Sequence, residues 1–281
     1  MLTTTENIYQ QKVNLVIDYI SAHLHHSLKL DAIVGEINMS QRQMLRIMKT
    51  ALNEPLHTYI VRQRMERAVM YMQTEEMSLT TLSEMVGYNN PQSFSKAFKN
   101  LYGISPKAYM KDLHLRLESM VRDNGNRQEL PLEIVEEEAL ELVYIRIIGH
   151  YGEEEPYAKA WGKLIQFIKS NKAITDDTRF IGISFDDPNI TQPNQCRFYA
   201  CASVKGKINP TGEFGTMRLK GGKYAVYTLK GSYSGLQEFY NCISVSFDYN
   251  LRHGIAFEEY LNSLYNTKEE DLVTKIYIPV K

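Results

Sequence analysis

The chain has 281 residues and a formal net charge of −1 at pH 7. This length is sufficient for two domains, each with a core of its own. The small net charge excludes a protein that binds nucleic acid through bulk positive charge alone. The three cysteines lack metal-binding spacing, and the chain shows neither a signal-peptide core nor an apolar run of transmembrane length. We therefore predict a cytoplasmic protein that uses no metal, no cofactor and no membrane.

A first helix is predicted after the cap-forming segment 3–7, because apolar residues recur at helical spacing from Val13 to Leu24. Three histidines, His23, His25 and His26, lie at the end of this pattern. No cysteine or acidic residue is spaced with them as a further ligand, so a solvated helix end is favoured over a metal site.

A helix-turn-helix unit is predicted next. Residues 30–37 form its first helix, and Ser40 caps a second helix that buries Met44, Ile47 and Met48. The arginines of the segment 55–72 that follows are interpreted most simply as a solvated face, and contact with DNA phosphates between two grooves is the alternative. These arginines are Arg62, Arg64 and Arg67, and the outward residues of the second helix are Gln41, Arg42, Leu45, Arg46 and Lys49.

A second unit of the same kind is predicted over residues 78–109. Ser78 caps a short helix that ends at Gly87, and Pro91 opens a second helix that ends at Gly103. The buried stripe of that second helix is predicted to be Phe94, Ala97, Phe98 and Leu101, while Gln92, Ser93, Ser95, Lys96, Lys99 and Asn100 face outward.

The two units are related by a shift of 50 residues. Met44, Arg46, Met48 and Lys49 coincide in type with Phe94, Lys96, Phe98 and Lys99. Two copies of one helical unit therefore lie in the first 115 residues. The alternative is a generic helical bundle with similar buried faces, and the matched basic residues on the outer face argue against it.

The run GYNNPQSFSKAFKNLYGISPKAY resembles the signature of AraC-type transcription regulators, and the resemblance covers residues 13–111. It implies two helix-turn-helix units joined by a long helix and facing successive major grooves of double-stranded DNA, with RNA polymerase as a further partner. Asn53 departs from the usual glycine, and Leu45 from the usual small polar residue. The residues implied in DNA binding are Gln41, Arg42, Leu45, Arg46, Lys49, Asn90, Gln92, Ser93, Ser95, Lys96 and Lys99.

The composition changes after Leu117. We predict an all-α DNA-binding domain over residues 1–117, a polar linker over 118–130 and an α+β domain over 131–281. Strands are predicted from residue 132 to 149, and Gly221-Gly222 is predicted to close a hairpin. Helices are predicted over 157–172 and 236–247, and further strands over 179–185, 197–204, 216–219, 223–229, 258–264 and 273–279.

The α+β domain contains a repeat of its own. Gly149 and Tyr151 recur as Gly231 and Tyr233 at an offset of 82, each pair between a strand and a helix, which suggests pseudo-two-fold strand–helix repeats. Of the 30 aromatic residues in the chain, 21 lie beyond residue 120. This density fits the wall of a ligand pocket, although an aromatic core accounts for many of the rings.

The segments GHY, ISFDDP, QCRFYACASV, GGKYAVYTLKGSY and AFEEY resemble the GyrI-like (gyrase-inhibitor-like) effector-binding domain over residues 132–280. The resemblance implies a cleft for cationic, lipophilic small molecules, with the acid of the F-E-x-Y motif, Glu258, at its base. Glu259 is then expected to face outward, because side chains alternate along a strand. The implied ligand-binding residues are Tyr151, Trp161, Tyr233, Phe257, Glu258 and Tyr260.

These features together predict a transcription regulator controlled by a small cationic or amphiphilic effector, and not an enzyme. The alternative is a hydrolase-type activity in which Glu258 acts with Tyr233 or Tyr151. A methyl-acceptor function is rejected, because Cys196 and Cys201 lack the Pro-Cys-His setting that it requires. The oligomeric state stays open.

Overall fold

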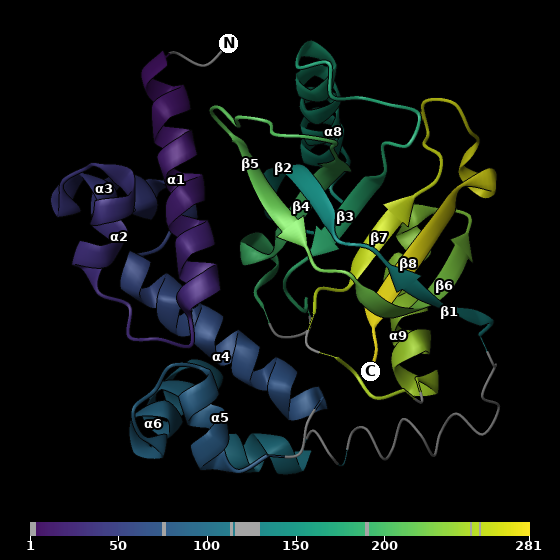
Figure 1. Ribbon diagram of the computed structural model, residues 1–281. Coiled ribbons are helices and arrows are strands. Elements are labelled where there is room, and N and C mark those ends of the chain that lie inside the picture. Colours follow the sequence, from purple (N-terminus) through teal and green to yellow (C-terminus); the bar gives the residue numbers. More distant parts are fainter. Residues whose placement is uncertain are drawn as a thin grey trace. The chain divides into compact units, whose positions relative to one another are not determined.

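The computed structural model describes residues 4–74, 77–112, 115, 130–188, 191–247, 249–252 and 254–281. The chain divides into two compact units, Met1–Asp123 and Asn124–Lys281. Nearly all of the predicted linker, residues 118–129, lies outside the described residues. Figure 1 labels the helices and strands of the two units.

The first unit is helical, as predicted. Among the described residues of this unit, six helices are followed by a further helical segment at residues 106–112. These six are α1 (Thr4–His23), α2 (Leu30–Ile37), α3 (Gln41–Leu52), α4 (Leu56–Thr74), α5 (Leu79–Met85) and α6 (Pro91–Tyr102).

Side-chain caps determine where the second helix of each helix-turn-helix unit begins. The Ser40 hydroxyl accepts from the Gln43 N–H in a capping box, and the Asn90 side chain accepts from the Ser93 N–H at 2.8 Å. At the other end of α3, Asn53 adopts a left-handed conformation with φ of 54°. Asparagine tolerates this conformation better than most residues with a Cβ, so it can replace the usual glycine here.

The core of the second helix-turn-helix unit differs from the prediction at one position. Phe94 and Phe98 are fully buried, whereas Leu101 is 43% exposed. The adjacent Tyr102 takes the inward position, with its ring 4.7 Å from that of Phe98 and 5.8 Å from that of Tyr109. The larger ring fills the space at the end of α6, and Leu101 is left outside.

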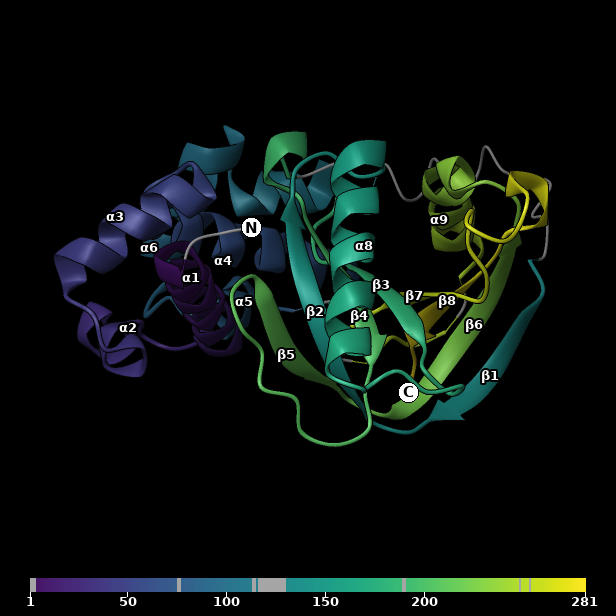
Figure 2. The same cartoon turned by 90° about the horizontal axis from the view of Figure 1, so that it is seen from above.

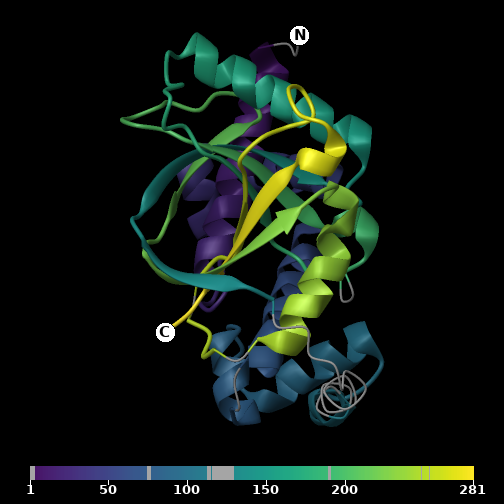
Figure 3. The same ribbon diagram turned by 90° about the vertical axis from the view of Figure 1, so that its right-hand side faces the viewer.

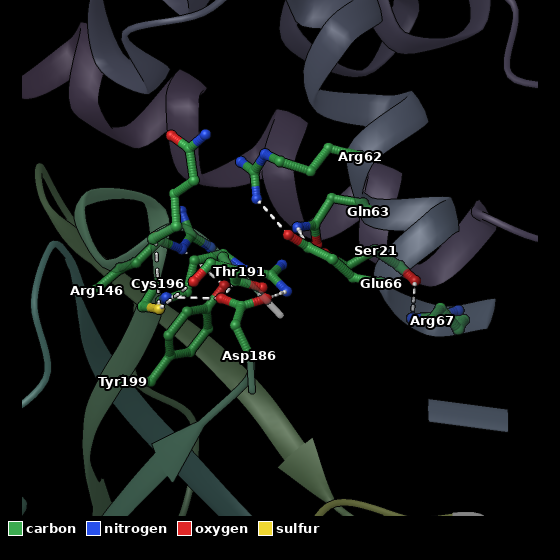
Figure 4. Close-up of polar contacts among 12 residues, drawn as sticks. Ser21, Arg62, Gln63, Glu66, Arg67, Arg146, Asp186, Thr191, Cys196 and Tyr199 are labelled. Carbon is green, nitrogen blue, oxygen red and sulfur yellow. Dashed lines mark hydrogen bonds and ion pairs between the residues drawn. The ribbon is translucent and has the colours of Figure 1, made fainter. Parts of the chain in front are cut away.

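The prediction of a solvated arginine face on α4 is wrong. Arg62 is 7% exposed and donates hydrogen bonds to Glu54 and Glu66. Arg64 donates to the Leu24 and His26 carbonyls at 3.1 and 2.7 Å, and Arg67 donates to the Ser21 carbonyl at 3.4 Å. Figure 4 shows the contacts of Arg62 with Glu66 and of Arg67 with Ser21. These arginines therefore satisfy carbonyls at the end of α1 and acids beside α4.

The second unit is an antiparallel sheet of eight strands in the order β1-β6-β8-β7-β3-β4-β2-β5. Its helices are α8 (Glu154–Ser170) and α9 (Leu236–Ser246), so the predicted α+β class is confirmed. The strands are β1 (Leu132–Glu137), β2 (Leu140–Ile148), β3 (Phe180–Ser184), β4 (Arg197–Ser203), β5 (Phe214–Leu219), β6 (Gly222–Lys230), β7 (Phe257–Tyr260) and β8 (Val273–Pro279).

The predicted hairpin at Gly221-Gly222 is wrong, because β5 pairs with β2 while β6 pairs with β1 and β8. The connection between β5 and β6 instead passes close to the connection between β1 and β2. A Cβ on Gly221 would lie 2.5 Å from the Glu137 oxygen and 2.8 Å from the Ala139 nitrogen. The glycine is needed for this close approach of two backbones and not for a tight turn.

The sheet has two distinct faces. Helices α8 and α9 lie on the same side of it, here called the helix face (Figure 2). Helix α8 packs on Val143 and Ala200, and α9 packs on Ala225 and Ile276. The other side, here called the tyrosine face, buries Tyr144, Tyr199, Tyr224, Tyr277 and Phe257 in one apolar cluster. Side chains on both faces are therefore shielded from water.

Candidate nucleic-acid interface and ligand site

Helices α3 and α6 present equivalent outer surfaces. Each has 12 residues, and each begins directly after its capping residue, Ser40 or Asn90. Arg46 and Lys96 consequently occupy the sixth position of their helices, and both side chains are exposed. The helix that enters the major groove needs such an uncovered polar and basic surface.

All predicted DNA-binding residues lie on or beside these two surfaces. Ser95 is half-buried and the others are exposed. Two of them also have local structural partners, since Asn90 caps α6 and Gln41 donates a hydrogen bond to Asp31. On α3 the exposed residues are Gln41, Arg42, Leu45, Arg46 and Lys49, and on or beside α6 they are Asn90, Gln92, Ser93, Lys96 and Lys99.

Glu258 lies in the middle of the sheet on the helix face. It pairs with Gly182 across the β3–β7 ladder and is only 4% exposed. Its carboxylate accepts hydrogen bonds from the hydroxyls of Tyr260 and Tyr240, the latter at 3.1 Å. Among the described residues, no Lys, Arg or His forms an ion pair with Glu258. The site therefore holds a buried acid whose hydrogen-bond donors are tyrosine hydroxyls.

Gly182 provides the space that this arrangement needs. A Cβ there would lie 2.8 Å from the Phe198 ring and nearer still to the Tyr260 hydroxyl. Tyr260 can thus lie over the neighbouring strand and reach back to the carboxylate two residues before it. A larger residue at position 182 would displace the hydroxyl.

Half-buried aromatic rings surround Tyr260. The ring of Trp161, from α8, lies 5.6 Å away at an interplanar angle of 90°, and the ring of Tyr233 lies 5.4 Å away at 78°. Both are edge-to-face contacts, a favourable geometry for aromatic pairs. The structure therefore brings together four predicted residues, Trp161, Tyr233, Glu258 and Tyr260.

Sequence reasoning missed Tyr240, the partner of Glu258 on α9. Helical spacing could have found it, because Leu236, Tyr240, Ile243 and Phe247 recur at intervals of three or four residues and pack in one apolar cluster. Because Tyr240 shares the apolar face of this helix, the spacing alone predicts that its side chain faces the sheet.

Burial controls the ionisation of this group of residues. Loss of water raises the pKa of the Glu258 carboxyl, while the hydrogen bonds from Tyr260 and Tyr240 oppose this change. Burial and the adjacent carboxylate raise the pKa of both tyrosines well above its usual value. The two hydroxyls therefore keep their protons and act as donors, and the carboxylate lacks a cationic partner among the described residues.

Two other predicted ligand residues are placed differently. The Tyr151 hydroxyl donates to the Asp186 and Arg197 carbonyls at 2.9 and 3.1 Å, which makes it an anchor for backbone. Phe257 lies on the tyrosine face, where its ring stacks on that of Tyr277 with centroids 4.3 Å apart. Since side chains alternate along β7, Phe257 and Glu258 cannot line the same site.

The expectation that Glu259 faces outward is wrong. It is 8% exposed on the tyrosine face, where Arg179 donates to its two oxygens at 2.7 and 2.8 Å and Tyr277 donates at 2.7 Å. These hydrogen bonds lower the pKa of Glu259 against the opposing effect of burial. Adjacent glutamates therefore occupy opposite environments, one with an arginine partner and one with hydroxyls alone.

A separate cavity of about 350 Å³ lies between α8 and β2. Its charged lining includes Lys163 and Glu213, which form an ion pair with an Nζ–Oε1 distance of 2.6 Å. It contains none of the predicted ligand residues, so it is not part of the Glu258 site. Within the described parts of the chain, no three His, Cys, Asp or Glu side chains are grouped as metal ligands, and no helix is long and apolar enough to cross a membrane.

Comparison with known families agrees with both halves of this description. The GyrI-like small molecule binding domain matches residues 130–281, and a helix-turn-helix domain matches residues 33–112. The chain therefore belongs to the GyrI-like family, and its first unit is an AraC-type helix-turn-helix domain.

Individual relatives match the first unit. The Msm operon regulatory protein of Streptococcus mutans is 31% identical over 101 residues, which cover 36% of this chain and 36% of that protein. The raffinose operon transcriptional regulatory protein RafR of Pediococcus pentosaceus is 27% identical over 37% of this chain and 37% of its own length. The chain thus spans less than half the length of these relatives. A cryo-electron microscopy structure of the EcmrR–DNA complex in EcmrR-RPo is 12% identical, with a TM-score of 0.47, and covers 84% of this chain and 98% of that one.

Proposed function

We propose that the protein is a transcription regulator that binds double-stranded DNA through α3 and α6 and is controlled by a cationic, amphiphilic small molecule held at Glu258. The observation that carries the ligand proposal is the buried Glu258 carboxylate, which has tyrosine donors and no cationic partner among the described residues. RNA polymerase is the expected partner of a regulator that acts on transcription.

A cation suits this site for two physical reasons. Charge attraction is stronger in a site from which water is largely excluded than in bulk solvent. The faces and edges of Trp161, Tyr233 and Tyr260 add apolar surface, and aromatic faces attract cations directly. A neutral ligand of the same shape gains only the apolar contacts, so the charge should dominate selectivity.

The repeat in the ligand-binding unit supports a site at this position. The strand order β1-β6-β8-β7 on one side of the β7–β3 pair mirrors β5-β2-β4-β3 on the other. We infer that the two halves are pseudo-two-fold repeats, with α8 and α9 as equivalent helices. Glu258 and Gly182 then lie where the halves meet.

The hydrolase alternative has little support. The hydroxyl partners of Glu258 are Tyr240 and Tyr260, whereas Tyr233 donates to the Asn262 carbonyl at 3.3 Å and Tyr151 to backbone. By their names, the relatives given above are an operon regulatory protein and a transcriptional regulatory protein. Turnover of a bound cation by the wild-type protein, lost in Glu258→Gln, would restore the enzyme interpretation.

The DNA proposal predicts distinct effects of three substitutions. Arg46→Ala and Lys96→Ala should each cost about 1–3 kcal/mol of specific binding, because both residues occupy the position proposed to read bases. Lys99→Ala should weaken binding to all sequences alike, as the loss of a phosphate contact does. A DNA site selected from random sequences provides the probe for fluorescence anisotropy.

Lys169→Ala is the matched control, since Lys169 is an exposed lysine on α8 of the other unit. It should leave DNA affinity unchanged. Protection of a single major groove in footprints, or equal losses for specific and random DNA in Lys96→Ala, would contradict the proposal that both helices read the site.

A further inference from the structure

Helix α9 packs in the same apolar cluster as the beginning of β1. The cluster joins Ile243 of α9 to Tyr227 of β6, and Leu130 and Leu132 pack against it. Leu132 is the direct neighbour of Tyr227 in the β1–β6 ladder. Figure 3 shows the teal start of β1 beside the yellow-green helix α9. Leu130 is the last residue of the segment predicted as the linker to the DNA-binding unit, so this apolar cluster lies where the chain enters the ligand-binding unit.

Tyr240 belongs to both this cluster and the Glu258 site. Its ring packs against the cluster of Ala225, Tyr227, Ile243, Ile276 and Val280, and its hydroxyl donates to Glu258 Oε1 at 3.1 Å. The second hydroxyl donor, Tyr260, comes from the same strand as Glu258. Of the two donors, only Tyr240 connects the carboxylate to a helix.

The strength of the Tyr240 bond depends on the charge of its acceptor. A hydrogen bond to an ionised carboxylate is stronger than one between neutral groups. When the site is empty, the two tyrosines are the donors that compensate the buried carboxylate. A bound cation would supply that compensation itself and reduce the contribution of the bond to α9. A ligand can shift a helix only through such a difference between two states.

The far end of β1 is held independently of the ligand. Glu137, its last residue, accepts a hydrogen bond from Arg179 at 2.6 Å, and Arg179 is bound in turn by Glu259. These contacts lie on the tyrosine face, away from Glu258. Only the beginning of β1, next to α9, is therefore positioned to respond.

We propose that Tyr240 couples the occupancy of Glu258 to the packing of α9 in the apolar cluster that Leu130 and Leu132 also contact, so that a bound cation loosens α9 and the start of β1 together. This inference rests on the proposed ligand site and deepens it, because it names the route by which the ligand acts on the chain that leads to the DNA-binding unit. The loss of the hydrogen bond between Tyr240 and Glu258, on which this coupling depends, can be produced by mutation without any ligand.

Hydrogen–deuterium exchange of the full chain, measured by mass spectrometry without ligand, tests the route. Tyr240→Phe should speed exchange about tenfold in residues 236–246 and 130–135, because local opening no longer breaks a hydrogen bond to a charged acceptor. Exchange in α8 should not change.

Tyr233→Phe is the matched control, since it removes a hydroxyl from the same group of rings but one that bonds to the Asn262 carbonyl. It should leave both segments at the wild-type rate. If residues 130–135 of the Tyr240→Phe variant exchange at the same rate as in the wild-type protein, the proposed coupling through Tyr240 is overturned. Failure of the wild-type protein to bind any cation would instead overturn the proposed function, and the two failures are distinguishable because the exchange test contains no ligand.

Discussion

Glu258→Gln is expected to weaken the binding of an aromatic quaternary ammonium ion by about 2–5 kcal/mol, because it leaves the cation unpaired in a site largely closed to water. Isothermal titration calorimetry with wild type and variant measures the difference directly. The fold should survive, since glutamine can still accept from the hydroxyls of Tyr240 and Tyr260.

Glu258→Gln should also raise the free energy of unfolding at neutral pH. Burial raises the folded-state pKa of Glu258 above its unfolded value, so the ionised carboxylate costs folding free energy once the pH exceeds about 4.5. Glu258→Gln removes that cost, and its advantage over wild type should grow as the pH rises through the folded pKa. Glu238→Gln, an exposed acid on α9, is the control for both measurements. Equal cation affinity in wild type and Glu258→Gln would show that the charge is not the anchor.

Glu259→Gln, unlike Glu258→Gln, should lower the free energy of unfolding, by about 2–3 kcal/mol. It breaks a buried ion pair and leaves Arg179 with Glu137 alone. Urea unfolding followed by circular dichroism gives the value. Arg179 and Tyr277 lower the pKa of Glu259, so its contribution is present above the unfolded value of about 4.5 and is lost as the pH falls through the folded pKa.

Glu270→Gln provides the comparison for this loss, because Glu270 forms an exposed pair with Lys268. Such pairs contribute about 0–1 kcal/mol, so this variant should unfold close to wild type. Equal stability of Glu259→Gln and Glu270→Gln would contradict the structural role assigned to Glu259. Cation binding by Glu259→Gln should persist, since its side chain lies on the face opposite Glu258.

Local signals predicted the helical unit well. Ser40, Ser78, Pro91 and Gly103 start or end helices through their own backbone and side-chain chemistry, and the structure places each at the expected end. The arginines of α4 were misjudged because their partners are carbonyls some 40 residues away, such as that of Leu24. Spacing along one helix carries no information about such contacts.

The sheet shows the same limit. Its strands were found from alternation, but the hairpin at Gly221-Gly222 was wrong because strand order depends on contacts distant in sequence. In the F-E-x-Y motif, alternation placed Glu258 opposite to Glu259 but could not reveal that the second face is also buried. That burial follows from the apolar cluster of the tyrosine face, whose buried members come from seven strands.

The binding of a cation at Glu258 is tested most directly by the fluorescence of Trp161, the single tryptophan of the chain, whose ring lies 5.6 Å from that of Tyr260. The wild-type protein is titrated with an aromatic quaternary ammonium ion and with the isosteric neutral compound in which carbon replaces nitrogen. We expect saturable quenching by the cation and binding of the neutral compound weaker by about 2 kcal/mol or more. Equal binding of the two compounds, or no response to either, would contradict the proposal that Glu258 anchors a cationic effector.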